Sequence, residues 1–124
     1  MTLLFVGLGG FIGAVLRFLI SGIVQKHFPG SFPVGTLTVN VLGSFVIGFL
    51  VLLFENLLAP QLKAFFVTGT LGALTTFSTF SFETVVMIQE GALFRAVLNV
   101  LLNVVLCIFA TFSGMGFYRI LFKL

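Results

Sequence analysis

Long apolar stretches recur along the chain and are separated by short polar or proline-containing segments. Acidic and basic residues are absent from residues 2–16, 64–82 and 96–118, and one histidine is the only titratable residue between Lys26 and Glu55. Crossing the hydrocarbon core of a bilayer takes about 20 apolar residues in a helix. The pattern therefore predicts an all-α integral membrane protein with transmembrane helices at about 3–25, 34–54, 61–88 and 94–122.

Turn-forming residues mark the connections between these helices. Pro29 and Pro33 stop the first helix, Pro60 follows the second, and Gly91 separates the third from the fourth. The connections are too short to separate domains, and the sequence has no low-complexity tract and no convincing internal repeat. We therefore expect residues 1–124 to form a single four-helix transmembrane domain.

The third apolar segment has an unusual centre. Residues 68–81 combine two glycines with seven serine and threonine residues, at a depth where leucine and valine normally dominate. Irregular backbone inside a membrane occurs where it is buried in protein or lines a cavity, and hydroxyl side chains can satisfy the freed backbone groups. Small residues also let intact helices approach closely. The composition therefore leaves two interpretations, a broken third helix or an intact packing helix.

Composition excludes a soluble domain. The 124 residues are 60% hydrophobic and 7% charged, with a mean hydropathy of +1.31, whereas about a quarter of the residues of a soluble domain carry charge.

The first residues lack the basic region of a signal peptide, and Arg17 lies inside the first apolar run, so we expect a retained helix. The single cysteine, Cys107, cannot form an intrachain disulfide or a cysteine metal site.

The distribution of positive charge bears on partners and on topology. The six basic residues are scattered along the chain, which argues against nucleic-acid binding. With four crossings, the side that holds both termini carries Lys63, Arg119 and Lys123, and the other side carries Lys26 and Arg95. The positive-inside rule needs a clear excess of lysine and arginine, which three against two does not provide. We predict insertion in both orientations; the alternative is that a single charge selects one.

Titratable groups are too few and too far apart for an enzyme site. The chain has three acidic residues, one histidine and one cysteine, with no phosphate-binding glycine loop and no histidine pair at metal-ligand spacing. We therefore expect no enzymatic activity, and transport that is passive or ion-coupled.

Several polar residues fall at membrane depth, and each has two interpretations. Arg17 is either an anchor that reaches the interface or a charge in an aqueous vestibule, and Glu83 is either a pore-end carboxylate or a helix-end residue. Asn99, Asn103 and Cys107 share one helical face because they are spaced by four residues. That face either solvates a passing ion or forms interhelical hydrogen bonds.

Two of the 18 phenylalanines differ from the rest by their neighbours. Phe77 and Phe80 flank Ser78 and Thr79 within the hydroxyl-rich segment. An aromatic ring has a negative face and a positive edge, so ring edges can contact an anion without a full charge. The arrangement suits a small, strongly hydrated anion that must also leave the site.

Three segments resemble the Fluc fluoride channels, also called the CrcB family. They are residues 9–17 (GGFIGAVLR), 35–40 (GTLTVN) and 72–81 (GALTTFSTFS), the last followed by Glu83. The resemblance implies an antiparallel homodimer of dual-topology subunits in membrane lipid, in the inner or plasma membrane of a bacterium, with two fluoride pores. It also implies a structural sodium ion, not transported, that backbone carbonyls of the two broken third helices hold at the dimer interface. In this chain those carbonyls belong to Gly72 and Thr75.

The same resemblance implies roles for individual side chains. Phe77 and Phe80 would contact fluoride, and Arg17 would lie near an aqueous vestibule. The other pore residues would be Asn40, Ser78, Thr79, Asn99, Asn103 and Cys107, the last three at positions where the family often has serine, threonine or tyrosine. The implied function is passive, selective fluoride export: hydrogen fluoride enters an acidified cell, ionises in the neutral cytoplasm, and leaves as the trapped anion.

Two other functions fit parts of the sequence. A small proton-coupled multidrug cation exporter also has four helices, with Glu83 as its carboxylate, but this chain lacks an early acidic residue and has one tyrosine and no tryptophan. A structural subunit of a larger complex would not need two phenylalanines in a hydroxyl-rich segment. For the dimer, a second homologous subunit is the alternative to an identical one.

The charge distribution gives a testable prediction about topology. We expect a tag on the C-terminus to be found on both faces of the membrane, because the lysine and arginine bias is too small to fix one orientation. Protease accessibility of the tag in sealed vesicles of known orientation measures this. Finding the tag on one face only would contradict the prediction.

Overall fold

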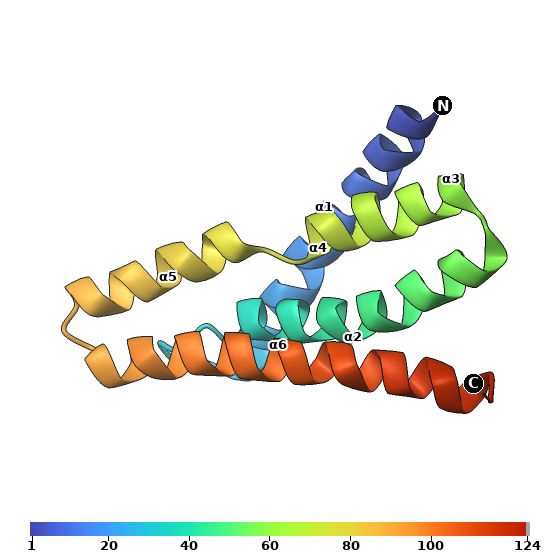
Figure 1. The fold of residues 1–124 in the computed structure, drawn as a ribbon. Helices are drawn as coiled ribbons and strands as arrows, with labels where there is room; N and C mark the ends of the chain where they lie inside the picture. The colour runs from blue at the N-terminus through green and yellow to red at the C-terminus, as the bar shows by residue number, and fades with distance from the viewer. Residues whose placement is uncertain (124) are drawn as a thin grey trace.

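The computed structural model describes residues 1–123, which form helices and turns without strands. Figure 1 shows the order of these elements. They are α1 (Thr2–His27), α2 (Val34–Leu57), α3 (Pro60–Lys63), the π-helix η1 (Ala64–Leu71), α4 (Gly72–Leu74), α5 (Phe77–Gln89) and α6 (Leu93–Leu121).

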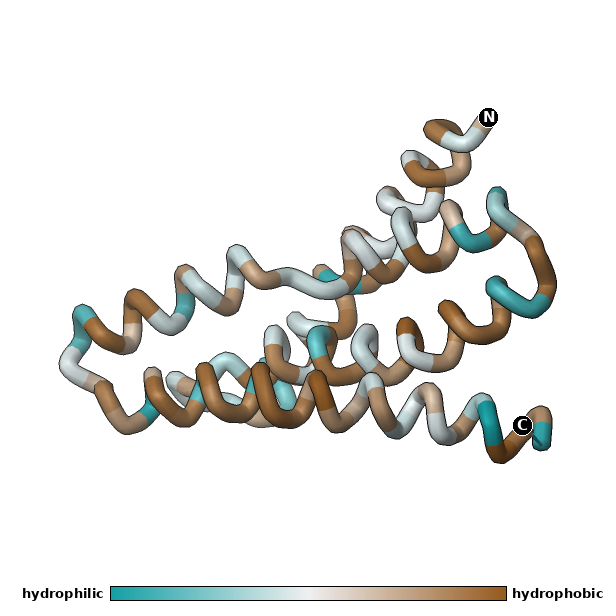
Figure 2. Tube along the Cα trace, in the orientation of Figure 1, coloured by the Kyte–Doolittle hydropathy of each residue, from teal (hydrophilic) through white to brown (hydrophobic). Residues whose placement is uncertain are grey.

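Four helical segments of the described chain are long and apolar enough to cross a membrane. They are Thr2–His27, Val34–Leu57, Pro60–Gln89 and Leu93–Leu121. Hydrophobic residues run along most of each segment, and hydrophilic ones concentrate near the turns and the C-terminus (Figure 2). This confirms the predicted all-α architecture with four helices able to span a membrane.

Large apolar side chains cover the outside of the molecule. Phe11, Phe18 and Phe112 are 71%, 78% and 71% exposed. The buried hydrophobic cluster is small by comparison and consists of Val39, Leu71 and Leu74. A surface of this kind is stable in contact with lipid tails, so the bilayer replaces the large core of a soluble domain.

The α2 and α6 helices lie along each other (Figure 1) and share the most extensive packing in the molecule. Glycines allow their backbones to approach closely. A Cβ atom added at Gly48 would clash with the carbonyl of Thr111, and one added at Gly114 would clash with the carbonyl of Phe45. Close approach of this kind is the usual source of helix association in lipid, where the hydrophobic effect between helices is absent.

A second glycine seam joins α1 to the third segment. The α1 helix crosses this segment at a steep angle (Figure 1) and packs on η1 and α4. Added Cβ atoms at Gly9 and Gly13 would meet the backbone of Phe65 and Thr70. Within η1, Thr70 Oγ1 donates to Phe65 O, five residues back, at 3.0 Å. This close packing fixes the position of the third segment along α1.

One side-chain amide closes the connection between α1 and α2. Gln25 Nε2 donates to Phe32 O at 3.0 Å, and Gln25 Oε1 accepts from the Gly35 N–H at 3.1 Å. These two bonds satisfy backbone groups that the non-helical turn leaves without a partner. The side chain therefore acts as a two-point clamp on the turn.

The seam between α2 and α6 predicts different effects for two glycines on the same helix. Gly114→Ala is expected to destabilise the protein by ~1–3 kcal/mol, because the new methyl group would meet the Phe45 backbone. Gly116→Ala is the matched control, since a Cβ atom there has nothing within 4 Å. SDS titration of the protein in mild detergent, followed by circular dichroism, measures the difference. Equal unfolding midpoints for the two variants would count against the close packing.

Candidate functional site

Helical geometry is interrupted inside the third segment. The α4 helix ends at Leu74 and α5 begins at Phe77, and both residues between them are extended: Thr75 has φ −82° and ψ 154°, and Thr76 has φ −150° and ψ 113°. Thr76 caps α5, because its Oγ1 accepts from the Thr79 N–H at 3.2 Å. Threonine is a preferred residue at this position for that reason.

The interruption releases two carbonyl groups from the helical hydrogen-bond ladder. In a continuous helix the Thr76 N–H would bond to Gly72 O, and the Thr79 N–H would bond to Thr75 O. Instead the Thr76 N–H donates to Asn40 Oδ1 at 2.8 Å, and the Thr79 N–H donates to Thr76 Oγ1. The oxygens of Gly72 and Thr75 have therefore lost their helical donors.

Asn40 on α2 holds the extended backbone at two points. Its Oδ1 accepts from the Thr76 N–H, and its Nδ2 donates to Thr76 O at 3.2 Å. Both residues are buried. The amide thus takes the place of the peptide partners that Thr76 would have in regular structure.

The two asparagines of α6 continue this hydrogen-bond network. Asn40 Nδ2 donates to Asn103 Oδ1 at 3.0 Å, and Asn103 Nδ2 donates to Asn99 Oδ1 at 3.0 Å and to Asn99 O at 2.9 Å. Asn99 Nδ2 donates to Thr84 Oγ1 at 2.9 Å, across to α5. Of the two interpretations of this polar face, the structure shows hydrogen bonds between helices for both asparagines.

A cavity of about 460 Å³ lies beside the interruption. It brings together seven of the candidate site residues that were predicted from the sequence. It is lined by Asn40, Gly43, Ser44, Ile47, Val67, Leu71, Gly72, Thr75, Thr76, Phe77, Phe80, Asn103, Val104, Cys107 and Ile108. The seven are Asn40, Gly72, Thr75, Phe77, Phe80, Asn103 and Cys107, the last of which contributes a thiol to the wall. The lining is mostly apolar, with polar groups gathered at the extended threonines.

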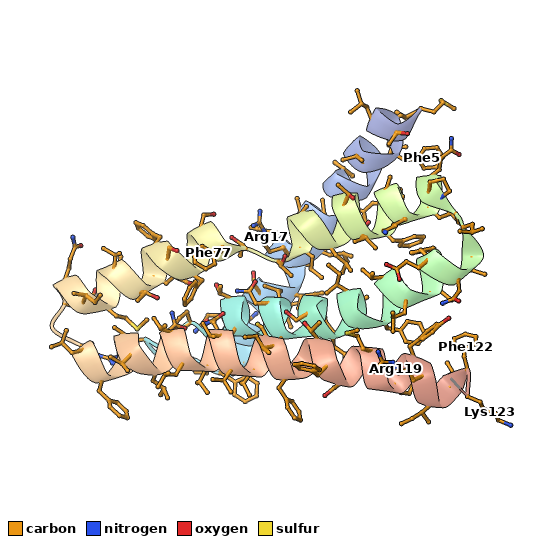
Figure 3. All side chains as sticks on the ribbon, viewed as in Figure 1. Phe5, Arg17, Phe77, Arg119, Phe122 and Lys123 are labelled. Atoms are coloured by element: carbon orange, nitrogen blue, oxygen red, sulfur yellow. The ribbon has the colours of Figure 1, made fainter. Side chains whose placement is uncertain are left out.

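Phe77 and Phe80 contact each other edge to face in the first turn of α5. Their ring centroids are 5.2 Å apart and the ring planes are inclined by 68°. Phe80 is 7% exposed, whereas Phe77, labelled in Figure 3 at the start of α5, is 77% exposed. The pair therefore consists of one fixed ring inside the protein and one ring at its surface.

The remaining predicted residues do not line the cavity. Ser78 and Thr79 are exposed in the first turn of α5, with their oxygens 3.4 and 3.0 Å from Thr76 Oγ1. Asn99 is 1% exposed and contacts α5. Arg17 is half-buried on α1 (Figure 3), and Glu83 is half-buried on α5, with Oε1 lacking a hydrogen-bond partner among residues 1–123.

Sequence reasoning missed two members of the network, Thr76 and Thr84. Thr76 has a local signal, because a threonine directly before the first apolar residue of a helix, here Phe77, is a typical helix cap. Thr84 lies four residues after Phe80 and donates to its carbonyl at 2.8 Å. Nothing local distinguishes Thr84 from any other helical threonine, because its partner Asn99 comes from α6.

Comparison with known proteins agrees with the sequence resemblance. The family model described as CrcB-like protein, Camphor Resistance (CrcB), matches residues 4–115. A relative from Sulfurovum sp. is 62% identical over 97% of this chain and 95% of its own length, and is named fluoride-specific ion channel FluC. Relatives with the same name from Nitratiruptor sp. and Methanocaldococcus jannaschii are 61% and 54% identical, over 95% and 90% of this chain and 89% and 90% of their own lengths. With its four apolar helices and a family match over nearly its whole length, the chain is a multi-pass cell-membrane protein that belongs to the CrcB family.

Proposed function

We propose that this protein is a fluoride-selective ion channel that exports fluoride passively and so lowers its concentration in the cytoplasm. The observation that carries the proposal is the edge-to-face pair of Phe77 and Phe80, set beside an interrupted helix and a cavity lined by both rings. The relatives named fluoride-specific ion channels, at 52–62% identity, support it.

The chemistry of the site supports an anion with a tightly held hydration shell. The positive ring edges of Phe77 and Phe80 attract an anion without binding it as strongly as a full charge would. The hydroxyl groups of Ser78 and Thr79 lie within one turn of both rings and supply donors that replace water. Selectivity then depends on the width of the path and the strength of its donors, and no energy source is needed.

We further propose that a second, antiparallel copy of the chain covers the cavity and completes two pores. The support is the exposure of Phe77, which borders the cavity, and the nearly equal lysine and arginine counts on the two faces. Arg17 would lie at an aqueous entrance, as the family resemblance implies, and Glu83, in the middle of α5, would be a carboxylate at the end of the pore. The third span then acts as a broken helix whose interruption faces the partner.

A structural sodium ion fits the backbone at the interruption. The carbonyl oxygens of Gly72 and Thr75 have lost their helical donors to Asn40 and to Thr76 Oγ1. Hard cations prefer oxygen ligands, and carbonyls at interrupted helices commonly supply them in membrane proteins. We propose that these carbonyls, with their counterparts in the partner subunit, would hold the ion, whose charge would join the two subunits.

The multidrug exporter is not favoured. The relatives reported above are all named fluoride channels. The exporter would also place its function on Glu83, which does not line the cavity.

Ion efflux from liposomes tests the proposed function. Vesicles that contain the purified protein and potassium fluoride should release fluoride quickly after valinomycin is added, and vesicles with potassium chloride should release little chloride, because the donors and path match the smaller anion. Ion-selective electrodes measure both. Absence of fluoride release from protein shown to be dimeric would overturn the proposal.

The phenylalanine pair gives a second prediction. Phe77→Ile and Phe80→Ile should each lower fluoride flux by about tenfold or more, because isoleucine keeps the bulk but has no positive ring edge. Phe94→Ile is the matched control, since Phe94 is 79% exposed at the start of α6 and does not line the cavity. The same efflux assay compares the three variants. Full flux in both pair variants would exclude a role for the rings.

A further inference from the structure

The hydrogen bonds around the cavity form one chain with a fixed direction. A backbone N–H can only donate, so the bond from Thr76 N–H requires Asn40 to present Oδ1 there. Asn40 Nδ2 is then left to donate to Asn103 Oδ1, and Asn103 Nδ2 in turn donates to Asn99. Each amide orientation is therefore determined by the one before it.

The far end of the chain is fixed by the backbone as well. Asn99 Nδ2 donates to Thr84 Oγ1, and the Thr84 hydroxyl donates to Phe80 O, which can only accept. The network thus starts at Thr76, directly before α5, and ends at Phe80, one turn into α5. It connects these two points through α2 and α6.

Two of the side-chain amides have no proton left to offer an ion. Asn40 Nδ2 uses its two protons on Thr76 O and Asn103 Oδ1. Asn103 Nδ2 uses its two on the backbone and side-chain oxygens of Asn99.

We propose that Asn40, Asn103, Asn99 and Thr84 form a positioning relay that holds the start of α5 and thereby orients the Phe77–Phe80 pair. In this assignment Asn40 and Asn103 set the geometry of the fluoride path without donating to the anion. The proposal rests on the proposed channel function and deepens it, because the relay determines which way the two rings face.

Burial makes the relay sensitive to the loss of any member. Asn40, Asn99, Asn103 and Thr84 are 7%, 1%, 6% and 9% exposed. Hydrogen bonds strengthen one another in such surroundings, and a donor left without an acceptor is costly there. A change at Thr84, which does not line the cavity, should therefore reach Thr76 through the amides.

Thr84 allows a test that separates the relay from simple packing. Thr84→Val keeps the shape of the side chain and removes the hydroxyl, whereas Thr84→Ser keeps the hydroxyl and removes the methyl group. We expect valine to lower fluoride flux by about tenfold and serine to stay within about twofold of the unmodified protein. Thr111→Val is the matched control, since among residues 1–123 the Thr111 hydroxyl bonds only within its own helix, to Cys107 O at 3.0 Å. Equal flux for valine and the unmodified protein, or lower flux for serine than for valine, would overturn the relay.

Amide exchange gives a readout that needs no ion. In protein labelled with ¹⁵N-threonine, Thr84→Val should speed hydrogen exchange of the Thr76 N–H by about tenfold, and Thr111→Val should leave it unchanged. An unchanged Thr76 rate in the Thr84→Val variant would overturn the relay. If the unmodified protein passes no fluoride, the channel function fails, and this measurement still decides the relay.

Discussion

The need to satisfy every backbone polar group away from water governs this structure. Lipid offers no hydrogen bonds, so a non-helical residue inside the membrane must find its partners within the protein. Thr75 and Thr76 are two such residues, and the side chain of Asn40 supplies both partners for Thr76. The extended backbone, the freed carbonyls and the phenylalanine pair all depend on the side-chain amide of Asn40, which takes the place of the missing peptide partners of Thr76.

Glycine makes the bond between Asn40 and Asn103 possible, because an asparagine side chain is short. It bridges two helices only when their backbones are close, and Gly48 and Gly114 allow α2 and α6 to approach until their backbones are in contact. The asparagines then link across this seam, as Asn40 and Asn103 do. Tight packing and polar bonding therefore support each other in holding the helices together.

The sequence predicts more of the fold than of the site. The four helices able to span a membrane follow from hydropathy, because lipid imposes a simple rule on length and composition. The grouping of Asn99 and Asn103 follows from helical periodicity. Their partners do not, since Thr84 and Asn40 come from other helices and only the tertiary packing selects them. The same holds for the burial of Phe80 and the exposure of Phe77, which look alike in sequence.

The length of α6 has a consequence for the surrounding lipid. Its stretch without charged residues, 96–118, extends roughly 35 Å at about 1.5 Å per residue, whereas the hydrocarbon core is about 30 Å thick. Such hydrophobic mismatch is relieved by tilting the helix or by thickening the bilayer around it. Because α2 is packed along α6, the two helices tilt as a unit and carry the amides of Asn40 and Asn103 with them. Lipids with shorter or longer acyl chains therefore change the tilt of α2 and α6, and with it the position of these two amides.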